Sequence, residues 1–292
     1  MECFLFQTKI KWDLLGVKHL KISRIGIISK EGHAEAKEIA RDIAELLLSS
    51  GFSVTSYPNL HVRNVEHVRS VGEIGKSGTD LVITVSGDGT ILRLLRALDS
   101  TLPCLCVNVG GRGILAEIKP DQIKFALRKI EEGDFHTERR LRISPSLESK
   151  SLPPALNEVL IIRQSLSKTP LFTLDLDHGT VFSERMDGML ISTPTGSTGH
   201  SYSFGSPFLE GSLQVFSITP IGSIKRFPTI ISSPGKIRVL GNYALKLVID
   251  GQDTFSVEAD TYVSFKRHDK EAVFVRFDRA GPYRQLKNLG FE

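Results

Sequence analysis

A carboxylate between two glycines gives the sequence its most chemically suggestive turn, SGDGT at Ser86–Thr90. Gly87 and Gly89 allow a ligand to approach the backbone closely. A helix is predicted to follow, and its first amides are unpaired and carry the positive end of the helix dipole, so the turn suits phosphate. A phosphate site alone has no need of Asp88, which would repel the ligand. The carboxylate therefore indicates a second task, which is to bind a hydroxyl group, take its proton or hold Mg²⁺. The structural alternative is an Asp N-cap or a simple Asp-Gly turn.

A second candidate is a long loop rich in hydroxyl groups, within DGMLISTPTGSTGHSYSFGSP at 187–207. It holds far more Thr, Ser and Gly than a connecting loop requires, which suits the ribose, phosphate or adenine part of a nucleotide. Its alternative is a solvated loop.

Three shorter stretches are weaker candidates on their own. Asn157-Glu158 can read donors and acceptors on a base or a ribose diol, but it also fits an ordinary strand edge. The glycines of VNVGGRGILAEI at 107–118 fit a phosphate-facing loop or a plain turn. Asp250-Gly251 in IDGQDTF reads first as a hairpin turn.

Other nucleotide and metal motifs are absent from the sequence. It contains neither a P-loop nor a Gly-x-Gly-x-x-Gly fingerprint after a strand. Its eight histidines make no ligand pair of the usual spacing, and we assign no residue as a metal ligand.

The elements that must position these residues fall into two parts. From Arg24, apolar runs with strand character alternate with helical runs, which predicts a Rossmann-like α/β domain over residues 1–140. Loops after parallel strands gather at one sheet edge, where such folds bind ligands. Residues 141–275 read almost entirely as strands and predict an antiparallel, β-sandwich-like domain. The segment 276–292 is predicted to be a helix that packs back on the first domain.

Composition limits the function further. The chain has 292 residues, 40% hydrophobic and 24% charged, with a formal net charge of +4. This suits an anionic small molecule and gives no nucleic-acid footprint. No apolar stretch predicts a membrane helix. Cys3, Cys104 and Cys106 lack zinc or thioredoxin spacing, so reduced thiols in the cytoplasm are expected.

Taken together, these motifs resemble the NAD kinase family, in the family's order from about Arg24 to Gln252. SGDGT resembles its Gly-Gly-Asp-Gly-Thr motif, Asn157-Glu158 its Asn-Glu motif, TPTGSTGHSYSFGSP its Thr-Pro-Thr-Gly-Ser-Thr loop, and Asp250–Gln252 its Asp-Gly-Gln. The resemblance implies an α/β domain, a β-sandwich-like domain and NAD between them, in a homodimer or homotetramer. It also implies that ATP or polyphosphate, with Mg²⁺, phosphorylates the 2′-hydroxyl of the adenosine ribose.

The resemblance also implies roles for individual residues. Asp88 matches the proposed general base, and Arg93 matches an adjacent basic position. The further ligand contacts that it implies are Gly89, Thr90, Asn157, Glu158, Arg185, Asp187, Thr198, Gly199, His200, Ser201, Tyr202, Ser203 and Gln252.

The sequence departs from the family pattern at two places. Ser86 replaces the first glycine, and Gly199-His200 stands where Ala-Tyr is common. Two other functions fit the same motifs: a lipid (diacylglycerol-type) kinase of the same superfamily, and a non-catalytic sensor of NAD(P). Asn157-Glu158 and the hydroxyl-rich loop argue against the first, and Asp88 argues against the second.

Overall fold

Apolar runs in the first part of the chain form one seven-stranded sheet. The computed structural model describes residues 22–98, 100–111 and 113–277. Adjacent strands are parallel, except that the last strand is antiparallel to its neighbour. The strand order is β3 (Val65–His67), β2 (Ser53–Tyr57), β1 (Arg24–Ser29), β4 (Leu81–Ser86), β5 (Pro103–Asn108), β19 (Ala272–Arg276) and β6 (His136–Arg140).

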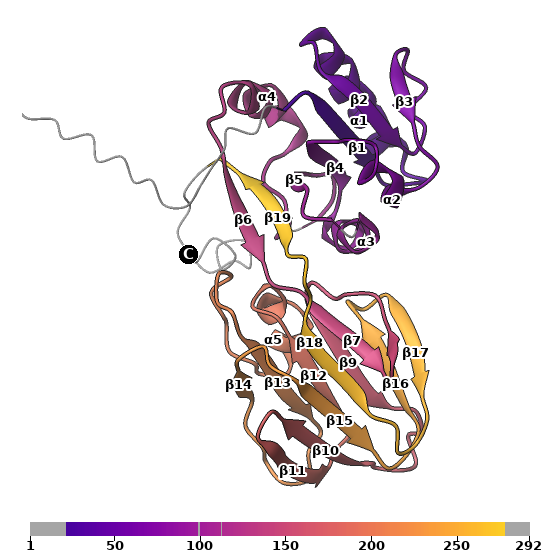
Figure 1. The fold of residues 1–292 in the computed structure, drawn as a ribbon, viewed down its shortest axis with the longest axis vertical. Coiled ribbons are helices and arrows are strands. Elements are labelled where there is room, and N and C mark those ends of the chain that lie inside the picture. The colour runs from indigo at the N-terminus through magenta and orange to yellow at the C-terminus, as the bar shows by residue number, and fades with distance from the viewer. Residues whose placement is uncertain (1–21, 99, 112, 278–292) are drawn as a thin grey trace, which may run out of the picture.

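Helices cover both faces of this sheet, as the alternating pattern predicts (Figure 1). One apolar core joins the sheet to α1 (Ala34–Ser49) and α4 (Ile123–Glu131), which follows the short 3₁₀ helix η1 (Pro120–Gln122). The other core joins it to α2 (Val71–Ile74) and α3 (Asp88–Leu98). The α/β prediction is confirmed.

The second part of the chain is a β-sandwich, as predicted. One sheet contains β11 (Gly179–Arg185), β10 (Leu171–Leu176), β15 (Ile237–Gly241), β18 (Val263–Arg267), β7 (Ile143–Leu147) and β8 (Lys150–Ser151). The other contains β14 (Ile230–Ser232), β13 (Phe216–Ile221), β12 (Gly188–Ser192), β9 (Glu158–Arg163), β16 (Leu245–Ile249) and β17 (Asp253–Val257). A single apolar core fills the space between them.

One strand lies in a different sheet from the one that the sequence pattern suggested. The run AVFVRF was assigned to the β domain up to residue 275, but β19 lies between β5 and β6 of the first sheet. The physical reason is its burial on both faces: all five residues are buried, which is typical of an interior strand of an α/β sheet. The chain thus crosses between the domains twice, and the amide of His268 bonds to the carbonyl of Arg142 where the crossings meet, at 2.9 Å.

Several sequence expectations fall outside the described residues. These are the predicted helix beyond Phe277, and Cys3. Cys104 and Cys106 are buried free thiols, as expected. Within the described part of the chain, no helix combines the length and apolar character needed to span a bilayer.

Candidate active site

Asp88 is the first residue of α3, directly after the turn that ends β4. Its two carboxylate oxygens accept the backbone amides of Ile114, at 2.9 Å, and Leu115, at 3.0 Å. Both amides belong to the glycine-containing loop that follows β5. Asp88 therefore binds the neighbouring loop, whereas the turn alone suggested a helix cap. Since two oxygens are held by two donors, the rotamer of Asp88 is fixed.

A small cavity lies against Asp88, between the two domains. Its volume is about 60 Å³. The α/β domain lines it with Asp88, Leu92, Ile114 and Leu115, and the β domain lines it with Asn157, Thr195, Thr198 and Gly199. The structure thus brings the glycine turn, the Asn-Glu pair and the start of the hydroxyl-rich loop to one place, although about 100 residues of sequence separate them.

The Asn157-Glu158 segment is held in place by the buried carboxylate of Asp250. This carboxylate accepts the amides of Leu156, Asn157 and Glu158 at 3.0, 2.8 and 3.2 Å. Burial raises the pKa of Asp250 in spite of these three hydrogen bonds and the neighbouring Arg96. Asp250 is therefore more than a turn residue, because it shapes one wall of the cavity.

Buried polar atoms on or next to this wall lack a partner within the described part of the protein. Asn157 Oδ1 and Thr195 Oγ1 belong to residues that line the cavity, and Glu158 Oε2 lies beside Gly199, which also lines it. Burial, reinforced by the Asp250 carboxylate, raises the pKa of Glu158 to about 8. Near neutral pH, Glu158 is thus mostly protonated and has an O–H to donate. Unpaired buried polar groups are costly, and a polar ligand in the cavity would satisfy those that face it.

The hydroxyl-rich loop folds into the 3₁₀ helix η2 (Thr195–Thr198) and the short helix α5 (His200–Ser203). Many of its hydroxyl groups are used internally: Ser197 Oγ bonds to the carbonyl of Pro194, and Ser201 Oγ to that of Gly196, at 2.7 and 2.8 Å. Gly196 lies so close to the carbonyl of Asn157 that a Cβ would clash. Compact packing, not a display of free hydroxyls, explains most of the composition of this loop.

Residues 200–203 of that loop do not line the cavity beside Asp88. His200, Tyr202 and Ser203 are exposed, and the ring of His200 lies 5.0 Å from that of Phe204. Ser201 is buried. Of the six positions expected at 198–203, only Thr198 and Gly199 line the cavity beside Asp88.

Arg185 and Asp187 lie far from Asp88 along the β domain. They precede β12, whereas the cavity lies beyond its other end, after Ser192. Arg185 donates to the carbonyl of Thr169, and Asp187 pairs with Arg163 at 3.0 Å. The structure does not bring these two residues to the cavity of the same chain.

Gln252 and Arg96 link the domains next to the site. The side chain of Gln252 donates to the carbonyl of Gly89, in the first turn of α3. Arg96, also on α3, donates to Gln252 at 2.9 Å, pairs with Asp253 at 3.1 Å and lies 3.6 Å from Asp250. Sequence reasoning missed Arg96, since an arginine on an amphipathic helix resembles any solvated side chain.

Thr90 and Arg93 line a second cavity of about 160 Å³ on another side of the first turns of α3. Ser29, Glu31 and Tyr57, at or after the carboxyl ends of β1 and β2, contribute to it. This is the sheet edge at which α/β folds bind ligands. Residues of α3 therefore line two separate cavities, one with Asp88 and one with Thr90 and Arg93.

Comparison with known proteins gives a consistent result. The profile of the ATP-NAD kinase N-terminal domain matches residues 25–135, and that of the ATP-NAD kinase C-terminal domain matches residues 156–277. The NAD kinase of Thermococcus kodakarensis is 31% identical over 271 residues, which cover 88% of this chain and 95% of that protein. The NAD kinase of Methanothermobacter thermautotrophicus is 34% identical over 264 residues, covering 88% and 92%.

Solved structures of NAD and NADH kinases are similar in fold to this chain. An NAD kinase from Archaeoglobus fulgidus in complex with ATP superposes with a TM-score of 0.72 and 27% identity, covering 91% of this chain and 97% of that chain. Yeast NADH kinase complexed with NADH gives a TM-score of 0.83 over 93% and 88% of the chains, and at 19% identity this likeness shows the fold alone.

The burial of Glu158 predicts a pH dependence of stability. Its pKa is about 8 in the folded protein and returns to the ordinary carboxyl range on unfolding, so the folded state binds the proton more tightly. This stabilisation is present at low pH and is lost as pH rises towards about 8, by at most about 1.4 kcal/mol per pH unit. The free energy of unfolding can be measured with urea at about pH 5.5 and about pH 8. Between these two pH values it should fall less for Glu158→Gln than for wild type.

The exposed Glu132 provides the control for that measurement. Glu132→Gln should keep the wild-type pH dependence, since its side chain is 54% exposed. If the free energy of unfolding falls equally with pH in wild type and in Glu158→Gln, the assignment of the raised pKa to Glu158 is wrong.

Proposed function

The chain belongs to the NAD kinase family, and we propose that it transfers the terminal phosphoryl group of ATP or polyphosphate to the 2′-hydroxyl of the adenosine ribose of NAD. As a member of that family it is a kinase that phosphorylates NAD. The observation that carries the finer proposal is Asp88: its carboxylate is fixed by two amides and faces a cavity whose opposite wall holds unpaired polar atoms.

In this proposal the ribose lies between Asp88 and the wall made by Asn157, Glu158 and Thr195. Asp88 accepts the hydrogen bond of the 2′-hydroxyl, orients its oxygen and takes its proton as the bond to phosphorus forms. The bond from that phosphorus to the leaving phosphate oxygen breaks, which gives NADP and ADP, or a polyphosphate one unit shorter. Phosphoryl transfer has a loose transition state, so this positioning supplies much of the catalysis.

The donor phosphates would enter at the second cavity, which Thr90 and Arg93 line. Arg93 supplies positive charge there, and α3 would hold donor and acceptor on adjacent sides of its first turns. The described residues contain no cluster of three or more ligating side chains. Mg²⁺ is usually held by one or two carboxylates together with substrate phosphates, so in this proposal it would arrive bound to the donor phosphates and offset their repulsion from Glu31.

We further propose a homodimer or homotetramer in the cytoplasm. Several large apolar side chains of the β domain are exposed, among them Leu166, Ile224 and Ile231, and Ile231 lies on the edge strand β14. Such positions suit contact with a second copy.

Asp88→Asn should lower kcat by about 10²- to 10⁴-fold, because the amide cannot take the proton. The Kd for NAD, measured by calorimetry, should change far less, since the opposite wall is intact. Asp253→Asn is the matched control: Asp253 is acidic and close by, but half-exposed and outside the cavity. It should keep kcat within about twofold, because the Asp253 carboxylate does not line the cavity. Near-wild-type turnover in Asp88→Asn would exclude the base assignment.

Arg93→Ala should raise the KM for ATP by about tenfold to a hundredfold, which is the value of a hydrogen bond to a charged group. The KM for NAD should stay close to that of wild type. Arg128→Ala, which removes an exposed arginine from α4, should change neither constant. If the KM for NAD rises and that for ATP does not, Arg93 belongs to the acceptor site.

Incubation with NAD and either ATP or polyphosphate, with Mg²⁺ or with a chelator, tests the reaction as a whole. Mass spectrometry should detect NADP with a donor and Mg²⁺, and the chelator should abolish the product. Binding of NAD without any NADP would instead indicate a sensor. Phosphorylation of diacylglycerol with no action on NAD would indicate a lipid kinase.

A further inference from the structure

Leu115 is held on both sides of its Cα. Its amide donates to Asp88 Oδ1 at 3.0 Å, and its carbonyl accepts from Arg276 Nη1 at 3.3 Å. Pairing of this loop with β5 resumes at Glu117 and Ile118, two residues further along the chain. The position of the amide that binds Asp88 therefore depends on a guanidinium group at the end of β19.

Arg276 is in turn fixed by two carboxylates. It is 7% exposed. Its Nε donates to Glu138 Oε2 at 2.8 Å, and its Nη1 lies 3.3 Å from Glu117 Oε2. The guanidinium carbon lies 4.9 Å from the centre of the Phe274 ring. A planar guanidinium with these partners can hardly rotate, so it offers the Leu115 carbonyl a donor at a defined place.

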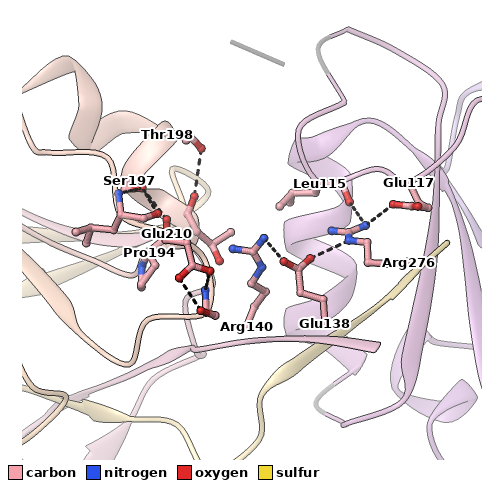
Figure 2. A network of polar contacts seen from close by, with 12 residues as sticks. Leu115, Glu117, Glu138, Arg140, Pro194, Ser197, Thr198, Glu210 and Arg276 are labelled. Atoms are coloured by element: carbon pink, nitrogen blue, oxygen red, sulfur yellow. Dashed lines mark hydrogen bonds and ion pairs between the residues drawn. The ribbon is translucent and has the colours of Figure 1, made fainter. Parts of the chain in front are cut away.

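The network continues towards the other domain, as Figure 2 shows. Arg140 donates to Glu138 Oε1 at 2.6 Å, and its guanidinium lies directly over Gly211 of the β domain, leaving no room for a Cβ there. Burial alone would raise the pKa of Glu138, but Arg140 and Arg276 bring it below its ordinary value, so Glu138 is charged at neutral pH. At the crossing between the domains, the charge of Glu138 is thus met by two arginines, Arg140 and Arg276.

We propose that Arg276 is a positioning residue for Asp88: it holds Leu115 from the carbonyl side, so that the Leu115 amide stays on the Asp88 carboxylate and fixes its orientation towards the acceptor hydroxyl. The proposal rests on the role of Asp88 as the general base. Arg276 does not line the cavity and acts only through Leu115.

The test is a double-mutant cycle. Arg276→Lys keeps the positive charge between Glu117 and Glu138 but cannot reach all three acceptors at once. It should lower kcat by about tenfold to a hundredfold, as a displaced catalytic group does, with the KM for NAD within about twofold of wild type. In the Asp88→Asn background, Arg276→Lys should lower kcat by less than about twofold further. The reason is that its effect passes through the Asp88 carboxylate, which is already lost.

A merely structural role would predict otherwise. Arg276→Lys would then lower activity by the same factor in wild type and in Asp88→Asn, and this result would overturn the proposal. If instead Asp88→Asn alone keeps its turnover, the base assignment fails, and the two failures are thereby distinguished.

Arg140→Lys is the matched control, because it perturbs the same glutamate without touching Leu115. Arg140→Lys should lower kcat by less than about threefold. An equal loss of kcat in Arg140→Lys and Arg276→Lys would overturn the proposal. Circular dichroism checks that Arg276→Lys unfolds cooperatively. If Arg276→Lys does not unfold cooperatively, Glu138→Gln takes its place in the cycle, because it loosens Arg276 without removing it. The losses of kcat in Glu138→Gln and Asp88→Asn should likewise not add.

Discussion

The pair of hydrogen bonds from the amides of Ile114 and Leu115 to Asp88 is the interaction on which the site depends. It requires β4 and β5 to be adjacent and parallel, so that the loops that follow them meet at one edge of the sheet. The two loops are also in van der Waals contact, since a Cβ on Gly110 would lie 3.6 Å from the Cα of Gly87. A Cβ on Gly87 itself would meet nothing within 4 Å, so the turn before Asp88 stays open to a ligand.

The opposite wall of the cavity is also shaped by a carboxylate that binds backbone amides. There the Asp250 carboxylate accepts three consecutive amides and fixes the Asn157-Glu158 segment. Arg96 lies on the same helix as Asp88 and reaches Asp250, Gln252 and Asp253. Helix α3 therefore carries the proposed base at its first turn and the link to the other wall two turns later. A buried carboxylate that binds backbone amides shapes a loop without needing a larger core, because each amide is satisfied and the loop is left with one conformation.

Much of this arrangement follows from the sequence because its signals are local. The strand and helix runs around SGDGT and the strand-rich second half each follow from patterns within a few residues, and the order of the motifs identifies the family. Other features depend on non-local pairing and could not be predicted. The run AVFVRF reads as a strand, but nothing in it shows that it returns to the first sheet. Arg185 and Asp187 are close in sequence to the hydroxyl-rich loop, yet the length of β12 separates them from the cavity. Arg276 gives no signal, since its partners come from residues more than 100 positions away.

The most direct test of this account is the crystal structure of the protein with NAD bound. The account predicts an Asp88 oxygen about 2.6–3.2 Å from the 2′-oxygen of the adenosine ribose, the reach of a general base. The amides of Ile114 and Leu115 should still bind the carboxylate, and Asn157 and Glu158 should lie on the other side of the sugar. An adenosine ribose placed elsewhere, or a 2′-oxygen held by a carboxylate other than Asp88, would contradict the account.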